Sequence, residues 1–279
     1  MKGTRKHIVL TTILVIFLIL ISLIVLYPIV FVVSAAFAPG NTATGLSIIP
    51  FADGFTLDHF TYLFNETNFT LWFQNTLIIA ICTSALSVIV CSLAAYIFSR
   101  FKFTLKKTML MALLVLQIFP SFVGMIAIYV IINRMHAYDQ LWGLVLVYVA
   151  GNVPYNTWLV KSYLDTIPKS LDEAARIDGA NHFTIFSRVV LPIAKPILIF
   201  LAITTFTGPW MDWIFPKLVL GSNEKQTLAL GLFSFVTDRK DQFTTFAAGA
   251  LLVAVPFIFF FVITQKQQTE SLGAAAVKE

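Results

Sequence analysis

Residues 170–192 read SLDEAARIDGANHFTIFSRVVLP and form a compact polar element between two strongly apolar stretches of the chain. Acids, arginines, a glycine and a histidine follow closely on one another here, whereas the flanking residues are those of a protein interior or a lipid bilayer. The structure and surroundings of this element therefore decide how the whole chain is interpreted.

The composition indicates a membrane protein. Of the 279 residues, 58% are hydrophobic, 12% are charged and 27 are phenylalanine. Soluble domains carry about 25% charged residues, so roughly half that proportion points to the bilayer. The first apolar stretch is longer than the core of a secretory signal, about 7–15 residues, and no small-x-small cleavage site with a mature soluble domain follows it. We therefore expect a retained span rather than a removable leader.

The apolar stretches predict six membrane spans, because a helix that crosses the bilayer needs about 20 mostly apolar residues. The six stretches are 8–36, 72–99, 108–132, 141–164, 196–215 and 246–264. The expected fold class is an all-α polytopic membrane protein with six transmembrane helices and a cytoplasmic loop that contains the polar element.

The distribution of lysine and arginine predicts the orientation. With both termini cytoplasmic, 14 of the 19 basic residues fall inside and five fall outside. The five are Arg134, Lys217, Lys225, Arg239 and Lys240. This bias follows the positive-inside rule. It also accounts for the net charge of +5, so no nucleic-acid partner is indicated.

The spans divide the chain into one membrane domain with two appendages. Residues 1–71 are expected to form a first helix and a long external loop, 72–266 a domain of five helices, and 267–279 a cytoplasmic tail. The polar element lies in the loop 168–192 of this domain. No repeat of fixed period and no soluble catalytic domain is visible.

The polar element carries the signals of two short helices. Ser170 and Glu173 have the spacing of a capping box, which predicts a helix start at Ser170. Gly179 is placed to end this helix in the left-handed conformation. A second helix is expected after Asn181, ending near a Leu-Pro pair. Alanines on such a bent pair permit close approach by another protein, although an interfacial helix lying on lipid has a similar pattern.

The same residues resemble a known family signature. The pattern EAA-x3-G-x9-I-x-LP of binding-protein-dependent ABC importer permeases appears with one conservative change, Val189 for the isoleucine, and with the DGA found in the sugar-importing branch. The matching positions are Glu173, Ala174, Ala175, Asp178, Gly179, Ala180, Leu191 and Pro192. In that family the element is the coupling helix, which docks on a separate ATPase subunit. The resemblance therefore implies a coupling role for these residues.

The resemblance extends over most of the chain. WFQNTL (72–77) resembles the opening of the core of such permeases. The segments 157–180, 226–235 (QTLALGLFSF) and 246–266 look like the smaller permease subunit of the maltose/maltodextrin branch. The ending SLGAAAVKE is similar to a tail that contacts the ATPase, although residues 267–270 depart from it. The implied fold is that of a type I ABC importer permease. The implied partners are a second homologous permease subunit, an ATPase subunit dimer, an extracytoplasmic sugar-binding protein and the sugar, at the plasma (inner) membrane of a prokaryote.

Signatures of an enzyme are missing from the sequence. It contains no G-x4-G-K-[ST], H-E-x-x-H or zinc-ligand spacing and no nucleophile elbow. We expect no cofactor and no metal on this chain, with ATP and Mg used by the partner ATPase. The histidines are expected to be solvated side chains in tails or loops. They are His7, His59, His136 and His182.

Polar residues within the predicted spans are candidates for a translocation path, because intramembrane polar groups are costly and often functional. The candidates are Gln117, Asn152, Tyr155, Asn156 and Trp210. Aromatic faces and amides suit a sugar. The same groups could instead bond neighbouring helices, and in the family the larger partner subunit supplies most of the sugar site.

The external stretch 216–245 is too long for a plain turn and rich in hydrogen-bonding groups. By resemblance, part of it reaches into the sugar-binding protein. The residues expected to do so are Gly221, Ser222, Asn223, Glu224, Lys225 and Gln226.

Three function classes compete for this sequence. A secondary transporter usually shows repeated halves and matching broken helices, and a membrane enzyme needs a cluster of catalytic residues; neither is visible. The favoured class is a non-enzymatic permease subunit for a maltose- or maltodextrin-like oligosaccharide. The alternatives are a permease for another carbohydrate or polyol and, less favoured, a self-contained secondary transporter.

Overall fold

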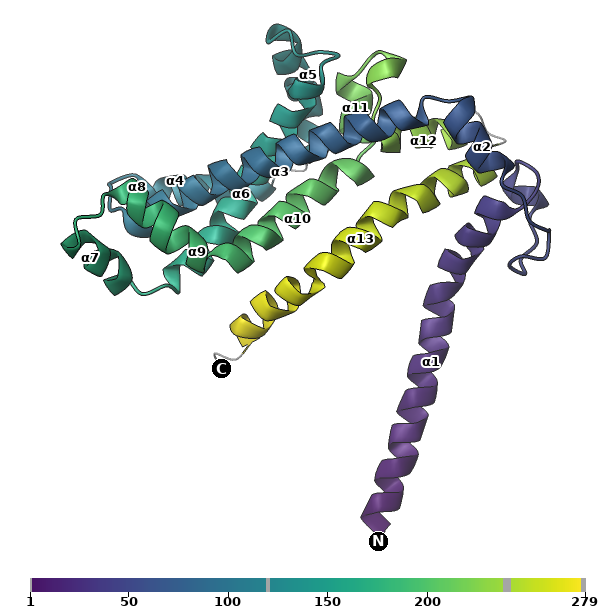
Figure 1. Ribbon diagram of the computed structural model, residues 1–279, viewed down its shortest axis with the longest axis horizontal. Helices are drawn as coiled ribbons and strands as arrows, with labels where there is room; N and C mark the ends of the chain where they lie inside the picture. The colour runs from purple at the N-terminus through teal and green to yellow at the C-terminus, as the bar shows by residue number, and fades with distance from the viewer. Residues whose placement is uncertain (1, 119–120, 238–241, 277–279) are drawn as a thin grey trace. The chain divides into compact units, whose positions relative to one another are not determined.

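The computed structural model describes residues 2–118, 121–237 and 242–276, and this part of the chain is helical with connecting loops and no strand (Figure 1). The long helices are α1 (Lys2–Phe37), α3 (Phe69–Arg100), α6 (Leu141–Asp165), α10 (Lys195–Met211) and α13 (Phe243–Ala276). The shorter helices are α2 (Asp58–Asn65), α4 (Lys106–Ile118), α5 (Met125–Arg134), α7 (Ser170–Ile177), α8 (His182–Thr184), α9 (Leu191–Ile193), α11 (Ile214–Val219) and α12 (Leu228–Thr237). The all-α fold class is confirmed.

The chain divides into two compact units. Unit 1 contains residues 1–67 and 232–255, and unit 2 contains 68–231 and 256–279. Unit 2 therefore holds the polar element, the predicted path residues and the loop 221–226.

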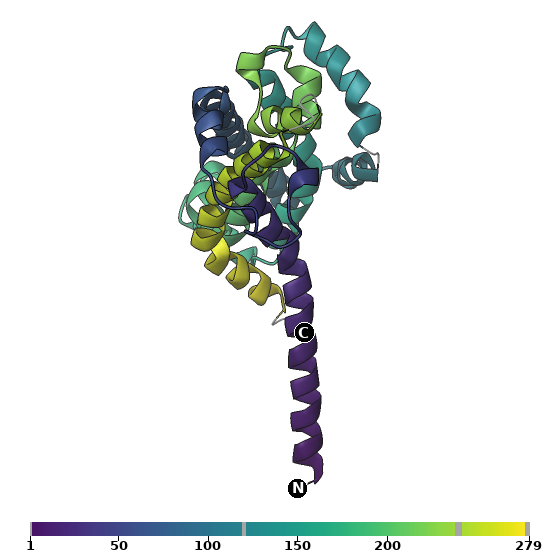
Figure 2. The same cartoon turned by 90° about the vertical axis from the view of Figure 1, so that its right-hand side faces the viewer.

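Unit 1 is built on the end of α1, which both views show as one long helix (Figure 2). The loop after α1 folds back on it: the N–H of Phe51 donates to the Ser34 hydroxyl at 2.6 Å. His59 was expected to be solvated, and this prediction is wrong. Its side chain is buried, with one ring nitrogen 3.0 Å from the Ala38 carbonyl oxygen and the other 3.3 Å from the Thr245 hydroxyl.

Unit 2 is built around α3, α6 and α10, which lie side by side in Figure 1. α3 contains neither proline nor glycine, so nothing in its sequence interrupts its hydrogen bonding. The hydroxyl of Ser84 on α3 donates to the Ala202 carbonyl of α10 at 2.9 Å. The elements α7, α8 and α9 lie together at the end of this bundle where α3 finishes.

The six predicted spans are recovered only in part. By length and hydropathy, two described helices qualify as spans, 10–37 and 69–100, and a third does if 182–193 and 195–211, bent by 80°, count as one. α6 covers the predicted fourth span as a continuous helix, and α13 runs through and beyond the predicted sixth. The number six therefore stays a prediction.

Two span boundaries differ from the prediction. The stretch 108–132 is not one helix: α4 ends at Ile118, and a 3-10 turn over Ser121–Gly124 precedes α5. The break coincides in sequence with Pro120, outside the described residues, and proline lacks the N–H that a helix interior needs. α10 ends at Met211 rather than 215, because Asp212 turns extended and its Oδ1 accepts the N–H of Ile214 at 2.8 Å.

Candidate functional site

Helix α7 begins at Ser170, as predicted, but the capping box does not form. Lys169 occupies the N-cap with helical dihedral angles, φ −67° and ψ −21°, and the helix start carries no side-chain cap hydrogen bond among the described residues. Ser170 therefore lies inside the first turn instead of in the extended conformation that an N-cap serine needs. The Glu173 side chain is exposed at this end of the helix.

The predicted end of α7 at Gly179 is confirmed. Gly179 has φ +84°. Its N–H donates to the Arg176 carbonyl at 3.0 Å, and the N–H of Ala180 donates to the Ala175 carbonyl at 2.9 Å. These two bonds form a Schellman motif. A Cβ added at Gly179 would meet nothing within 4 Å, so the glycine is needed for its backbone conformation rather than for space.

The second half of the element starts where the sequence predicts. The Oδ1 of Asn181 accepts the N–H of Thr184 at 2.8 Å, which caps the new helix. A π-helical segment, Ile185–Val190, then joins α8 to α9. Pro192 lies in the first turn of α9, where its missing N–H costs little. The π-helical geometry itself was not predicted.

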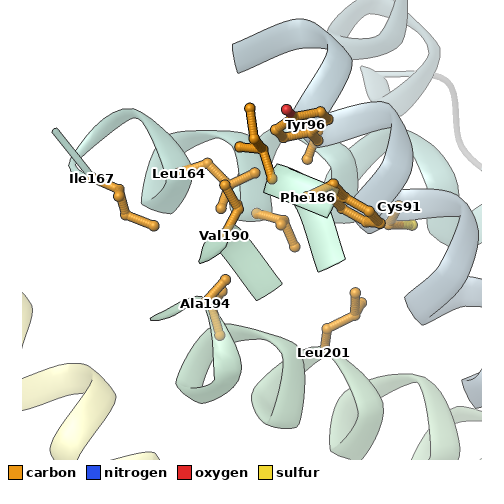
Figure 3. Packing of buried hydrophobic residues seen from close by; sticks show 12 residues of the cluster. Cys91, Tyr96, Leu164, Ile167, Phe186, Val190, Ala194 and Leu201 are labelled. Atoms are coloured by element: carbon orange, nitrogen blue, oxygen red, sulfur yellow. The ribbon is translucent and has the colours of Figure 1, made fainter. Parts of the chain in front are cut away.

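A buried apolar cluster fastens this element to the helices beneath it. Figure 3 shows Phe186 and Val190 among side chains of α3, α6 and α10, including Tyr96 and Leu201. The ring centroids of Tyr96 and Phe186 are 5.1 Å apart. Ala175, Ala180 and Leu191 pack against the same cluster. These three matched positions thus hold the element in place.

A buried ion pair adds a second fastening. The Nε of Arg100, the last residue of α3, lies 2.8 Å from Oδ2 of Asp172 on α7, and the two side chains are 3% and 6% exposed. The Nε–H is not aimed along this contact, so the interaction is an ion pair without hydrogen-bond geometry. The guanidinium also donates to the carbonyls of Leu164 at 3.0 Å and Ile167 at 3.2 Å. Arg100 therefore joins α3, the end of α6 and α7.

The element exposes two large apolar side chains. Ile177 is 87% exposed and Phe183 is 73% exposed, one on each side of the Gly179 turn. Glu173, Ala174 and Asp178 are exposed on the same short element. Large exposed apolar side chains next to charges are typical of protein contact sites. Arg100, Asp172, Ile177 and Phe183 were not predicted as functional candidates from the sequence. Arg100 lies at the end of a predicted span and far along the chain from the motif, so nothing in the sequence indicated its ion pair with Asp172.

The predicted path residues are only partly brought together. Asn152 and Asn156 share one face of α6, with Asn156 Nδ2 donating to the Asn152 carbonyl at 2.9 Å and Asn152 Nδ2 to the Ser87 hydroxyl at 3.3 Å. Asn152 also lines a cavity of about 680 Å³ between α5, α6 and α10. Tyr155 is exposed outside that cavity, and Gln117 is exposed on α4.

Trp210 packs among other aromatic rings. It is 2% exposed, and its ring lies 5.3 Å from that of Phe73, 5.9 Å from that of Phe206 and 6.1 Å from that of Phe257. This geometry favours a packing role. The polar lining of the cavity instead includes Tyr148 and Asp212, whose hydroxyl and Oδ2 are 2.9 Å apart.

The loop 221–226 is held by side chains from two other segments. Asn75 of α3 donates from Nδ2 to the carbonyls of Glu224 at 2.8 Å and Gln226 at 3.0 Å. The carboxylate of Asp139, between α5 and α6, accepts the N–H groups of Gly221 and Ser222, each at 3.0 Å. Neither anchor was predicted.

Comparisons with known proteins agree with the family signature. The family model for the binding-protein-dependent transport system inner membrane component matches residues 87–268. The maltodextrin transport system permease protein MdxG of Bacillus subtilis (strain 168) is 41% identical over 94% of each chain, and the galactooligosaccharides transport system permease protein GanQ of the same strain is 38% identical over 92% of each. A solved bacterial ABC transporter involved in the import of the acidic polysaccharide alginate has the same fold: TM-score 0.82, 21% identity, covering 94% of this chain and 97% of that one. This chain therefore belongs to the inner membrane components of binding-protein-dependent transport systems.

Proposed function

We propose that this chain is the permease subunit of an ATP-driven oligosaccharide importer. It forms half of the translocation path and is coupled through residues 168–192 to a separate ATPase. The observation that carries the proposal is the architecture of this element: two helical segments set by Gly179, fastened from within by Arg100 and Asp172, with Ile177 and Phe183 exposed.

The exposed side chains of the element 170–192 support the coupling role. Apolar side chains at the centre of a contact, ringed by charged ones, supply most of the binding energy at protein interfaces. In this proposal Ile177 and Phe183 are the apolar centre, Glu173 and Asp178 are charged side chains around it, and the small Ala174 permits close approach. ATP and Mg belong to the partner that docks here, and this chain carries no catalytic residue.

A maltodextrin-like oligosaccharide is the proposed substrate, with another carbohydrate as the alternative. The two relatives named above are, by name, permeases for maltodextrin and for galactooligosaccharides. Asn152, Asn156 and Tyr155 are the proposed path residues on α6, and Gln117 is a weaker candidate because it lies on α4. We leave Trp210 out of the proposed path, since its ring is enclosed by Phe73, Phe206 and Phe257.

The proposed assembly contains a second homologous permease subunit, an ATPase dimer and an extracytoplasmic sugar-binding protein. In the proposed topology six spans cross the plasma membrane, both termini are cytoplasmic, and the loop 221–226 faces outward to the binding protein. Asn223 and Glu224 are the exposed side chains of that loop.

The test of this function is transport by the reconstituted complex. The chain is co-expressed with its partner subunits, and uptake of labelled maltodextrin and galactooligosaccharide into proteoliposomes is measured with internal ATP. Ile177→Asp should remove ATPase co-purification and uptake, because it places a charge at the apolar centre of the contact. Leu105→Asp, at an exposed apolar side chain outside the element, is the matched control. Normal uptake with Ile177→Asp would reject the coupling role, and transport of neither sugar would reject the substrate class.

A further inference from the structure

The loop 221–226 has a fixed conformation whose main support is one carboxylate. Asp139 lies in the connection between α5 and α6, with φ +56°, a left-handed conformation that aspartate adopts more readily than most residues. Its own N–H donates to the Val219 carbonyl at 2.8 Å. The backbone of Asp139 is therefore bonded to the segment that leads into the loop, independently of its side chain.

The carboxylate of Asp139 accepts hydrogen bonds from several donors of the loop. Oδ1 accepts the N–H of Gly221 and the N–H of Ser222, each at 3.0 Å, and the Ser222 hydroxyl lies 2.9 Å from both carboxylate oxygens. The Nζ of Lys225 lies 3.5 Å from Oδ2 and donates to the Asp139 carbonyl at 2.5 Å. A single carboxylate thus organises three of the six loop residues.

The remaining part of the loop is fixed by α3. The side-chain amide of Asn75 donates to the carbonyls of Glu224 and Gln226, and the indole N–H of Trp72 donates to the Asn223 carbonyl at 3.3 Å. These bonds use backbone atoms of the loop. The side chains of Asn223 and Glu224 are left exposed at its tip, with the Asn223 Oδ1 accepting from Gln226 Nε2 at 3.0 Å.

We propose that Asp139 is the positioning residue of the loop 221–226: it holds the loop in the conformation that the extracytoplasmic binding protein recognises. This inference rests on the proposed function of the loop and adds a residue outside the loop that acts through the loop's conformation. A loop already ordered before binding loses less conformational entropy on docking, so its affinity for the partner is higher. Without the Asp139 carboxylate, the donors of Gly221 and Ser222 lose their shared acceptor and Lys225 loses its ion pair, so the loop samples other conformations.

The experiment uses the full complex with its ATPase and binding protein. ATP hydrolysis is measured against binding-protein concentration for the wild type, Asp139→Ala and Asp139→Asn. We expect Asp139→Ala to raise the half-maximal concentration about tenfold or more, because several charge-assisted hydrogen bonds are lost. Asp139→Asn should give an intermediate value, since one acceptor oxygen remains for the two N–H groups. Asp58→Ala, an exposed aspartate at the start of α2, is the matched control and should not change the value.

Loop mobility provides a readout that separates positioning from overall folding. A spin label at Glu224→Cys should become more mobile in Asp139→Ala and show an intermediate mobility in Asp139→Asn. An unchanged half-maximal concentration in Asp139→Ala would overturn the proposal. Loss of subunit assembly in both Asp139 variants would also overturn it, because it would make Asp139 a general folding residue.

A shortened loop distinguishes this inference from the function on which it rests. If deleting 222–225 abolishes stimulation while Asp139→Ala leaves it unchanged, the positioning role alone fails. If the deletion leaves stimulation intact, the contact function of the loop fails, and the positioning role fails with it.

Discussion

Arg100 and Asp172 form a buried ion pair, Nε to Oδ2 2.8 Å, between the end of α3 and α7, the first helix of the polar element 170–192. Both side chains are almost fully enclosed, and the guanidinium also satisfies two carbonyls near the end of α6. A buried pair of this kind contributes little net stability compared with apolar residues of the same volume, but the loss of one partner leaves an uncompensated charge. The pair therefore fixes the geometry of the element.

Breaking this pair should disturb coupling more than assembly of the spans. We expect Arg100→Met to destabilise the element by about 3–5 kcal/mol, because Asp172 is left buried without its partner. The double variant Arg100→Met/Asp172→Leu should recover part of that loss. The measurements are membrane insertion, ATPase co-purification and uptake. Lys161→Met, which removes a partly exposed i,i+4 pair with Asp165, is the control and should cost less, about 1 kcal/mol or below. Equal effects of the two single changes would contradict the prediction.

Gly179 should be sensitive through its backbone. Any residue with a Cβ is strained at φ +84°, at a cost of about 1 kcal/mol, while the space around the position is open. Gly179→Ala and Gly179→Leu are therefore expected to reduce ATPase co-purification and uptake to a similar extent. Gly179→Asn should be milder, since asparagine tolerates the left-handed region. A strong dependence on side-chain size would instead indicate a steric contact in the assembled complex.

Glu173→Ala should separate docking from folding. No capping box involves this residue in the described structure, and its side chain is exposed, so removing it should change stability by less than about 0.5 kcal/mol. We expect normal insertion and thermal stability with weaker ATPase co-purification, measured with the purified complex. A fall in thermal stability equal to that of a lost cap would show that the serine–glutamate box forms after all.

Two single cysteines should test the topology. In a variant without Cys82 and Cys91, Asn223→Cys is expected to react with a membrane-impermeant thiol reagent in intact cells. Leu105→Cys, on the cytoplasmic side in the proposed topology and outside the proposed ATPase contact, should react only after the membrane is permeabilised. Both parent side chains are exposed, so a missing reaction reports the side of the membrane rather than burial. Labelling of Leu105→Cys in intact cells would contradict the six-span topology.

The loop 221–226 should keep its order at neutral pH. Partial burial raises the pKa of Asp139, but the N–H groups of Ser222 and Gly221, the Ser222 hydroxyl and the Lys225 ammonium outweigh it and hold the pKa below its usual value. A carboxyl with a lowered pKa stabilises the folded form above its ordinary pKa of about 3.9, and this contribution is lost as the pH falls through the lowered value. We therefore expect spin-label mobility at Glu224→Cys to be constant from about pH 5 to 8. An increase in mobility within that range would contradict the assignment.

Local sequence signals predicted the helical element well. The first helix ends at Gly179 and the second begins after Asn181, as predicted, because the conformation of Gly179 and the cap of Asn181 depend only on neighbouring backbone atoms. Ser170 failed as a cap because Lys169, the residue before it, already has helical dihedral angles. The anchors Arg100 and Asp139 act on residues about 70 to 85 positions away, so their roles arise only from the fold. The cavity beside Asn152 and the enclosure of Trp210 are likewise products of helix packing.

The uninterrupted helix α3 connects the two ends of unit 2. Its first turns hold the loop 221–226 through Trp72 and Asn75, and its last residue holds α7 through Arg100. Thirty-two residues at the helical rise give a helix of about 48 Å. A tilt of about 10° around one end of such a helix displaces the other end by about 8 Å. In the proposed assembly, a small angular movement started by the ATPase at one end of α3 would thus arrive at its other end as a displacement longer than one helical turn.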